Sequence, residues 1–284
     1  MQRILSTYLF IQRKLTPSLL GEIARHGMNA VEIFCALSHF NYHSPVVVRE
    51  IAGALRDQNL MLHALHSPAE RDFNPMHESS APLSICDPER VRRLEAVDEI
   101  KRALDVAEYL PFRYLVQHVG SQRDPADERR FDAAFSSLEH LHIYAKERGV
   151  TVAIENTPGE MAAPAHLRRL IVETRLTGLR MCFDIGHAHI GDGVLPSLEP
   201  MREFLVTSHM HDNHGLKDEH LPPYEGTIDW KSALAALPAE LPLVFELKEK
   251  PAYADPAPVS VALSAARAAF DRAERALSSA EQAS

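Results

Sequence analysis

"VTVAIE" (residues 150–155) and "LRMCFD" (residues 179–184) are apolar almost throughout, and each ends on an acid. Short runs of this kind are typical of strands in a parallel sheet buried on both faces. Eight segments of the chain read this way, separated by longer amphipathic stretches, and 284 residues arranged so predict a single (β/α)8 barrel. The other six are "ILSTYLF" (4–10), "AVEIFC" (30–35), "LMLHALH" (60–66), "RYLVQHV" (113–119), "FLVTSHM" (204–210) and "PLVFEL" (242–247).

The stretches between these strands carry helix start signals. Thr16 followed by Pro17, and Ser44 followed by Pro45, predict an N-cap and a first turn. Asp87 and Pro88 predict a third start of the same kind. No linker or composition break interrupts residues 1–284, so we expect one domain that ends in a helix and a polar tail.

Composition restricts the classes of function. The net charge of −9 and the pI of about 6.0 do not indicate a polyanion as partner, so nucleic acid is disfavoured without being excluded. Three scattered cysteines form no disulfide framework and favour a reducing cytoplasm. The sequence contains no apolar run of membrane-spanning length and no secretion signal, so we expect no membrane association.

Polar side chains stand at or near the ends of six predicted strands, in the order His66, His118, Glu155, Asp184, His209 and Glu246. The carboxyl ends of parallel barrel strands all lie on one rim, so these six side chains should converge there. Taken singly, a histidine at a strand end is more often merely hydrogen-bonded, and an acid such as Asp184 often only caps the next helix. Glu246 inside "LVFELK" (243–248) is harder to explain, because a buried carboxylate needs a cation or a donor.

Imidazole together with carboxylate suits a divalent metal, and the mixture favours zinc, manganese or cobalt over magnesium or calcium. The segment "SHMHDNHGLKDEH" (208–220) adds Asp218 and His220, and His187 follows Asp184 in "FDIGHAH". The sequence therefore predicts one to three divalent ions at the barrel rim. The longest irregular segment, residues 67–87, follows the third strand on this same face, where long loops are often functional.

With these residues assembled, the chain resembles the xylose isomerase-like barrel superfamily, which includes sugar isomerases and epimerases and also the endonuclease IV family of abasic-site nucleases. The resemblance covers nearly the whole chain. It is carried by "LHSP" (65–68), "QHVGS" (117–121), "AIENTPG" (153–159), "CFDIGHAHIGDG" (182–193), "SHMHDN" (208–213), "DEHLPPYEGTIDW" (218–230) and "VFELK" (244–248).

The resemblance implies three groups of metal ligands. In the sugar epimerases a quartet like Glu155, Asp184, His209 and Glu246 holds the central cation. His66 and His118, bridged by Glu155, resemble a second metal position, and His187, Asp218 and His220 resemble a third. His189, His211 and His214 receive no role.

The resemblance favours a metal-dependent sugar or sugar-phosphate isomerase or epimerase working through an enediolate. Glu155 and Glu246 would move the proton, while His187 and Lys217 would contact the substrate. Two other reactions stay open: phosphodiester hydrolysis at a trinuclear zinc centre, and dehydration of a keto-sugar or inosose. A sugar-binding barrel without catalysis is disfavoured because every one of the nine ligand positions holds a residue of matching type. Barrels of this superfamily often associate, so a homo-oligomer is possible.

Overall fold

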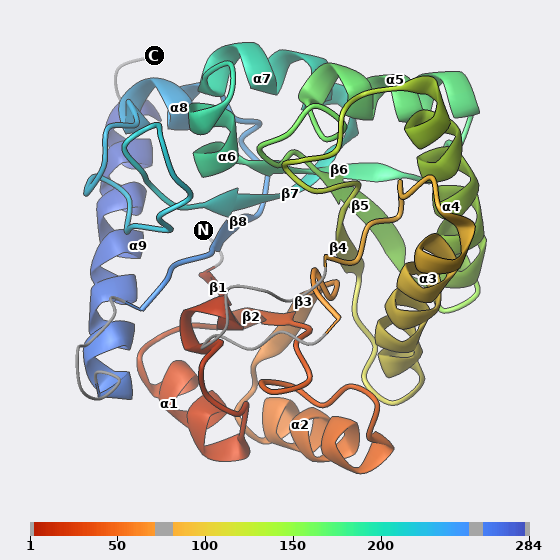
Figure 1. Cartoon of the computed structure of the whole chain (residues 1–284). Coiled ribbons are helices and arrows are strands. Elements are labelled where there is room, and N and C mark those ends of the chain that lie inside the picture. The colour runs from red at the N-terminus through yellow and green to blue at the C-terminus, as the bar shows by residue number, and fades with distance from the viewer. Residues whose placement is uncertain (1–2, 72–81, 250–257, 282–284) are drawn as a thin grey trace.

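The computed structural model describes residues 3–71, 82–249 and 258–281, in which eight parallel strands form one closed (β/α)8 barrel, as predicted (Figure 1). Each strand pairs with the next along the chain, and β1 pairs with β8 to close the ring. The strands are β1 (Ile4–Ser6), β2 (Ala30–Phe34), β3 (Met61–His66), β4 (Tyr114–His118), β5 (Thr151–Glu155), β6 (Arg180–Asp184), β7 (Leu205–Met210) and β8 (Leu243–Phe245).

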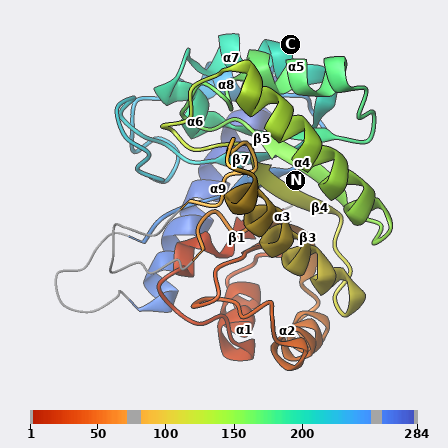
Figure 2. The same cartoon turned by 45° about the vertical axis from the view of Figure 1, so that its right-hand side comes forward.

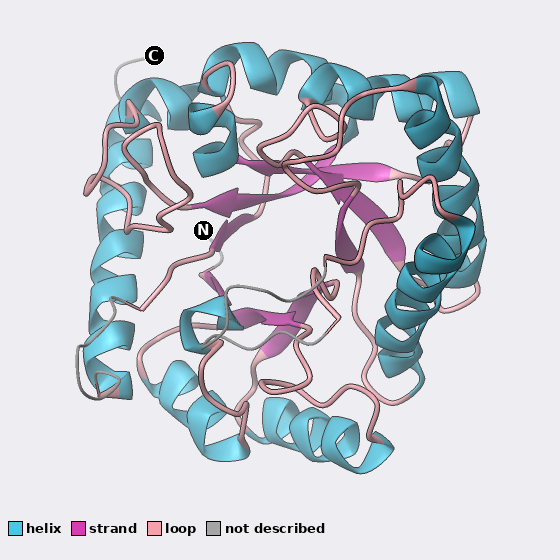
Figure 3. Ribbon diagram, viewed as in Figure 1, coloured by secondary structure: helices cyan, strands magenta, loops and turns pink. Residues whose placement is uncertain are grey.

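Helices surround this barrel as an outer ring (Figure 3). The α-helices are α1 (Pro17–Arg25), α2 (Pro45–Asp57), α3 (Arg90–Leu104), α4 (Glu128–Lys146), α5 (Pro164–Thr174), α6 (Ile185–Ile190), α7 (Val194–Met201), α8 (Trp230–Ala236) and α9 (Val259–Glu281). Short 3-10 helices are η1 (Thr7–Phe10), η2 (Asp105–Glu108) and η3 (Arg202–Phe204).

The first and last strands are shorter than predicted. The chain leaves β1 at Ser6 because the Ser6 hydroxyl accepts a hydrogen bond from the Tyr8 backbone N–H and starts η1. Residues 7–10, predicted as strand, therefore form a 3-10 turn on the rim. β8 stops at Phe245, so Glu246 is the first residue beyond the barrel wall.

Two predicted helix starts are confirmed and one is wrong. Thr16 and Ser44 cap α1 and α2, each followed by the expected proline. The third helix begins at Arg90 and not at Pro88, with Glu89 in place of Asp87 as its N-cap. The reason is local: the Asp87 carboxylate accepts the Glu89 backbone N–H at 2.8 Å, and this turn delays the helix by two residues.

The last helix, α9, packs against the neighbours on each side of the barrel seam, α8 and α1 (Figures 1 and 2). Arg3, just before β1, binds Asp271 and Glu274 of α9 at 2.8 Å. Phe270 is fully buried, and its ring centroid lies 3.7 Å from that of Phe245 in β8. α9 therefore covers the place where the first and last strands meet.

Two predictions fall partly outside the described residues. Within the predicted loop of residues 67–87, residues 72–81 are not described, and the flanking chain is joined by an antiparallel bridge between Glu70 and Pro82. α9 extends to Glu281, so most of the expected polar tail is helical, and residues 282–284 are not described. Among the described helices, none combines the length and apolar character that crossing a membrane requires.

Phe270→Ala should lower the free energy of unfolding by about 3–5 kcal/mol, because it opens a cavity against β8 at the seam. Urea unfolding followed by circular dichroism measures the change. Val261→Ala is the control on the same helix, since Val261 is 57% exposed, and it should cost less than about 0.5 kcal/mol. Equal losses in the two variants would show that α9 does not hold the seam.

Candidate metal centre

The barrel brings the predicted quartet together. Glu155, Asp184 and His209 end or nearly end β5, β6 and β7, and Glu246 follows β8. All four are buried, and ligand atoms of the four lie within 4.8 Å of one another. Parallel pairing explains this, because Asp184 and His209 are direct partners in the register of β6 and β7.

His209 lies at the centre of the quartet. Its Nδ1 is 2.9 Å from Glu155 Oε1, 3.5 Å from Glu246 Oε2 and 3.7 Å from Asp184 Oδ2. Three carboxylates therefore face one ring nitrogen. The other nitrogen, Nε2, points to Glu32 in the barrel interior.

The predicted second group also forms. Glu155 Oε2 lies 3.3 Å from His66 Nε2 and 3.1 Å from His118 Nε2. His66 ends β3 and is fully buried, whereas the His118 side chain at the end of β4 is 27% exposed. Glu155 thus presents one oxygen to the quartet and the other to this pair of histidines.

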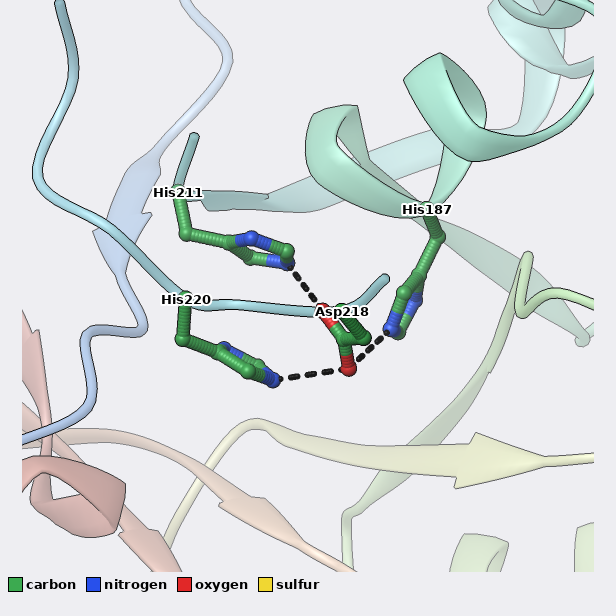
Figure 4. A group of neighbouring side chains, drawn as sticks. All are labelled: His187, His211, Asp218 and His220. Atoms are coloured by element: carbon green, nitrogen blue, oxygen red, sulfur yellow. Dashed lines mark hydrogen bonds and ion pairs between the residues drawn. The ribbon is translucent and has the colours of Figure 1, made fainter. Parts of the chain in front are cut away.

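The third group contains one residue more than predicted. Asp218 lies between His187 from α6 and His220 from the β7–α8 loop, and His211 approaches it from the end of β7 (Figure 4). Asp218 Oδ2 is 3.2 Å from His187 Nε2 and 2.9 Å from His220 Nε2, and Asp218 Oδ1 is 3.6 Å from His211 Nε2. We call these four residues the outer set.

His211 carries a signal in the sequence. It stands two positions after His209, and side chains two apart in extended chain share a face. The His211 ring stacks on that of His220 with centroids 4.1 Å apart, and its Nε2 also lies 3.1 Å from Asp184 Oδ2. Asp184 therefore connects the quartet to the outer set.

The loop that carries Asp218 and His220 is organised by Asp212. The fully buried Asp212 carboxylate accepts hydrogen bonds from four N–H groups, three on the backbone and one on an indole ring. The donors are Asn213 N, Tyr224 N, Ile228 N and Trp230 Nε1. Trp230 thus anchors this loop through its indole N–H, and the outer set is held in place by contacts independent of any ion.

Burial and charge act against each other on the ligand groups. Burial alone would raise the pKa of Glu155, but the charges of His209 and His118 hold that pKa well below its ordinary value. Burial would lower the pKa of His187, yet Asp184 and Asp218 raise it well above the usual value. These directions favour carboxylates paired with protonated imidazoles, whose protons a divalent cation could replace.

Three further polar side chains of this region lie outside the three ligand groups. Lys217 is exposed, and within the described residues no hydrogen bond or ion pair joins it to the ligand groups. His189 contacts Thr227, and His214 contacts Glu219, so both lie outside the ligand groups. These two histidines are therefore the ones in residues 187–220 that take no part in a ligand group.

Sequence reasoning also missed an aromatic wall at the rim. Tyr8 in η1 lies with its ring centroid 4.7 Å from that of His220 and 5.1 Å from that of Phe34. Phe34, at the end of β2, stacks on His66 at 4.4 Å. Burial, followed by the nearby charge of Glu246, raises the pKa of Tyr8, so its hydroxyl stays neutral at physiological pH.

Comparison with known proteins finds matches in sequence and in fold. A family model described as "Xylose isomerase-like TIM barrel" matches residues 20–267. A protein named "Uncharacterized protein MJ1311" from Methanocaldococcus jannaschii is 29% identical over 242 residues, covering 82% of this chain and 78% of that protein. A "Probable endonuclease 4" from Natronomonas pharaonis is 26% identical over 207 residues, covering 66% of this chain and 70% of that one.

Among solved structures, a D-tagatose 3-epimerase-like protein superposes with a TM-score of 0.78 at 21% identity, and the alignment covers all of both chains. At this level of identity the likeness shows the fold alone.

Metal-free protein should lose stability as the pH rises above about 6.5. Folding raises the pKa of His66, His187, His209 and His220, so their contribution is complete below the ordinary histidine value and disappears as the pH passes the raised values. The melting temperature after chelation should fall between pH 6.5 and 9.

His39 has the opposite effect on stability, but only below pH 6.5. Burial lowers the pKa of His39 to about 4, so the loss of stability that it causes appears on acidification, outside the measured range. Protein reloaded with zinc is the control and should show a smaller decline. A metal-free melting temperature that stays level or rises over this range would contradict the ion pairing described above.

Proposed function

This chain belongs to the family of xylose isomerase-like TIM barrels, and from that premise we propose that it is a divalent-metal-dependent isomerase or epimerase of a sugar or sugar phosphate. The epimerase-like solved structure supports the choice of chemistry. The observation that carries the proposal is the buried quartet, in which Glu155 at the end of β5 and Glu246 just after β8 face one imidazole.

The residues present fit a bound cation. The quartet offers one imidazole and three carboxylates, a donor mixture suited to manganese, cobalt or zinc. Glu246 Oε1 is buried without a hydrogen-bond partner among the described residues, as is expected of an oxygen awaiting an ion or a substrate. Bound there, the cation would polarise a substrate carbonyl and offset the negative charge that develops beside it.

Glu155 and Glu246 are the proton carriers in this proposal. One carboxylate removes the proton on the carbon beside the carbonyl, and either carboxylate returns it. Return to the neighbouring carbon, with the hydroxyl proton passing between the two oxygens, gives isomerisation, and return to the opposite face of the same carbon gives epimerisation. Glu246 is the stronger candidate for the base, because both oxygens of Glu155 already face imidazoles.

Two residues are proposed to position the substrate. His187 is 93% buried next to the quartet, and with a cation in the quartet alone it could orient a substrate hydroxyl, whereas zinc in the outer set would take it as a ligand. Lys217 precedes Asp218 on the exposed loop and could meet a phosphate or carboxylate of the substrate. The aromatic wall of Tyr8 and Phe34 would face the carbon skeleton, which suits a sugar.

Phosphodiester hydrolysis is the second candidate, because Glu155 connects all three ligand groups in the way that a three-ion centre needs. The outer set argues against it. Four protein donors complete a four-coordinate ion, which leaves no position for phosphate and is typical of a structural site. A dehydratase would begin with the same proton removal and differ only in the loss of a hydroxyl.

We also propose a reducing compartment such as the cytoplasm. Cys35, Cys86 and Cys182 are all buried and unpaired as disulfides.

Glu246→Gln should reduce proton exchange by about 10²–10⁴-fold, because the amide cannot accept the proton. The assay follows deuterium uptake from D2O beside the carbonyl of ketopentoses, ketohexoses, their phosphates and keto-cyclitols, with metal content measured in parallel. Glu240→Gln is the control, since Glu240 is exposed three residues before β8.

The same panel separates the alternatives. Loss of water from the substrate would identify a dehydratase. No exchange on any sugar, combined with cleavage of abasic-site DNA in zinc, would replace the proposal with the hydrolase.

His211→Asn should lower the zinc content per chain, because it removes one of the four outer donors. Metal analysis after equilibrium dialysis measures the change. His214→Asn changes an exposed histidine of the same loop and should leave the zinc content as in the parent protein. Unchanged zinc in the His211 variant would remove that residue from the outer set.

A further inference from the structure

We infer that Glu32, on the strand opposite the quartet, fixes the ring tautomer of His209 and thereby sets the affinity of the quartet for its cation. The inference rests on the proposed function only in requiring that the quartet binds a metal. It assigns a positioning role to a residue that touches neither the cation nor the substrate.

Glu32 lies in the middle of β2 with its side chain inside the barrel. It pairs in register with Ser6 of β1 and Ala64 of β3, and it is fully buried. Both carboxylate oxygens lie 3.1 Å from His209 Nε2. The contact therefore spans the barrel from β2 to β7.

The two sides of the His209 ring face different partners. Nδ1 faces Glu155, Glu246 and Asp184, whereas Nε2 faces Glu32. A neutral imidazole has one N–H and one lone pair, and an ionised carboxylate can only accept. Glu32 thus holds the proton on Nε2, which leaves the Nδ1 lone pair directed at the position where three carboxylates converge.

Fold stability does not explain a carboxylate at this place. The interior layers of such barrels are normally filled by branched apolar side chains, and an ionised group there loses its hydration. The neighbouring interior polar contact is between neutral groups, with His63 Nε2 3.0 Å from the Thr207 hydroxyl. Replacing a buried ion pair by apolar residues is often neutral or stabilising, so a positioning role accounts for Glu32 better.

The experiment compares Glu32→Leu, Glu32→Gln and Thr207→Val with the parent protein. Cobalt affinity is measured by competition with a chelator, and the cobalt absorption spectrum reports the ligand field. Glu32→Leu should weaken binding by about 10–100-fold, and Glu32→Gln, which keeps an acceptor oxygen, should weaken it less. Thr207→Val removes the interior hydrogen bond to His63, in which His209 Nε2 takes no part, and the variant should bind cobalt as the parent does.

Nitrogen NMR of the zinc-loaded parent should show the His209 proton on Nε2. Parent-like affinity in both Glu32 variants, equal losses in Thr207→Val, or a proton on Nδ1 would each overturn the inference. Should Glu32→Leu fail to fold, Glu32→Gln and the NMR measurement still decide it. None of these readouts uses a sugar, so a protein that binds cobalt tightly but turns over no sugar would refute the proposed function alone.

Discussion

The site depends on one buried carboxylate, Glu155, which meets histidines of all three ligand groups. Its Oε1 lies 2.9 Å from His209 and 3.5 Å from His187, and its Oε2 lies near His66 and His118. Such a carboxylate is tolerable out of water only while cations or protonated imidazoles surround it. The histidines at the rim are therefore a requirement of placing Glu155 there, and together with the carboxylates they form groups that could hold a metal ion.

The quartet and the outer set differ in how they are built. Quartet residues sit at the ends of barrel strands, where pairing between strands limits their movement. Asp218 and His220 sit on a loop, and they reach the centre because the Asp212 carboxylate collects the N–H groups of that loop. A fixed centre next to a loop-borne one suits a division between chemistry and structural support, and it favours a sugar enzyme over a hydrolase that needs open coordination at every ion.

Reasoning from sequence succeeded where the physics is local. Strand-end polarity located Glu155, Asp184 and His209, and Ser or Thr before Pro located the starts of two helices. It failed where a neighbouring side chain changes the backbone: Ser6 ends β1 early, and Asp87 delays α3. Neither bond could be weighed against strand or helix propensity without knowing the surrounding packing.

The sequence by itself determined the barrel and the rim on which the polar side chains gather, because eight apolar runs set the strand count and six of them carry His, Asp or Glu at or near the same end. Only the tertiary structure decided that His211 joins His187, Asp218 and His220, and that Glu32 lies against His209. Both facts depend on side chains brought together from different strands and loops. Closure of the barrel sets the distances between those segments, and apart from the two-residue spacing of His209 and His211 no local pattern in the chain records them.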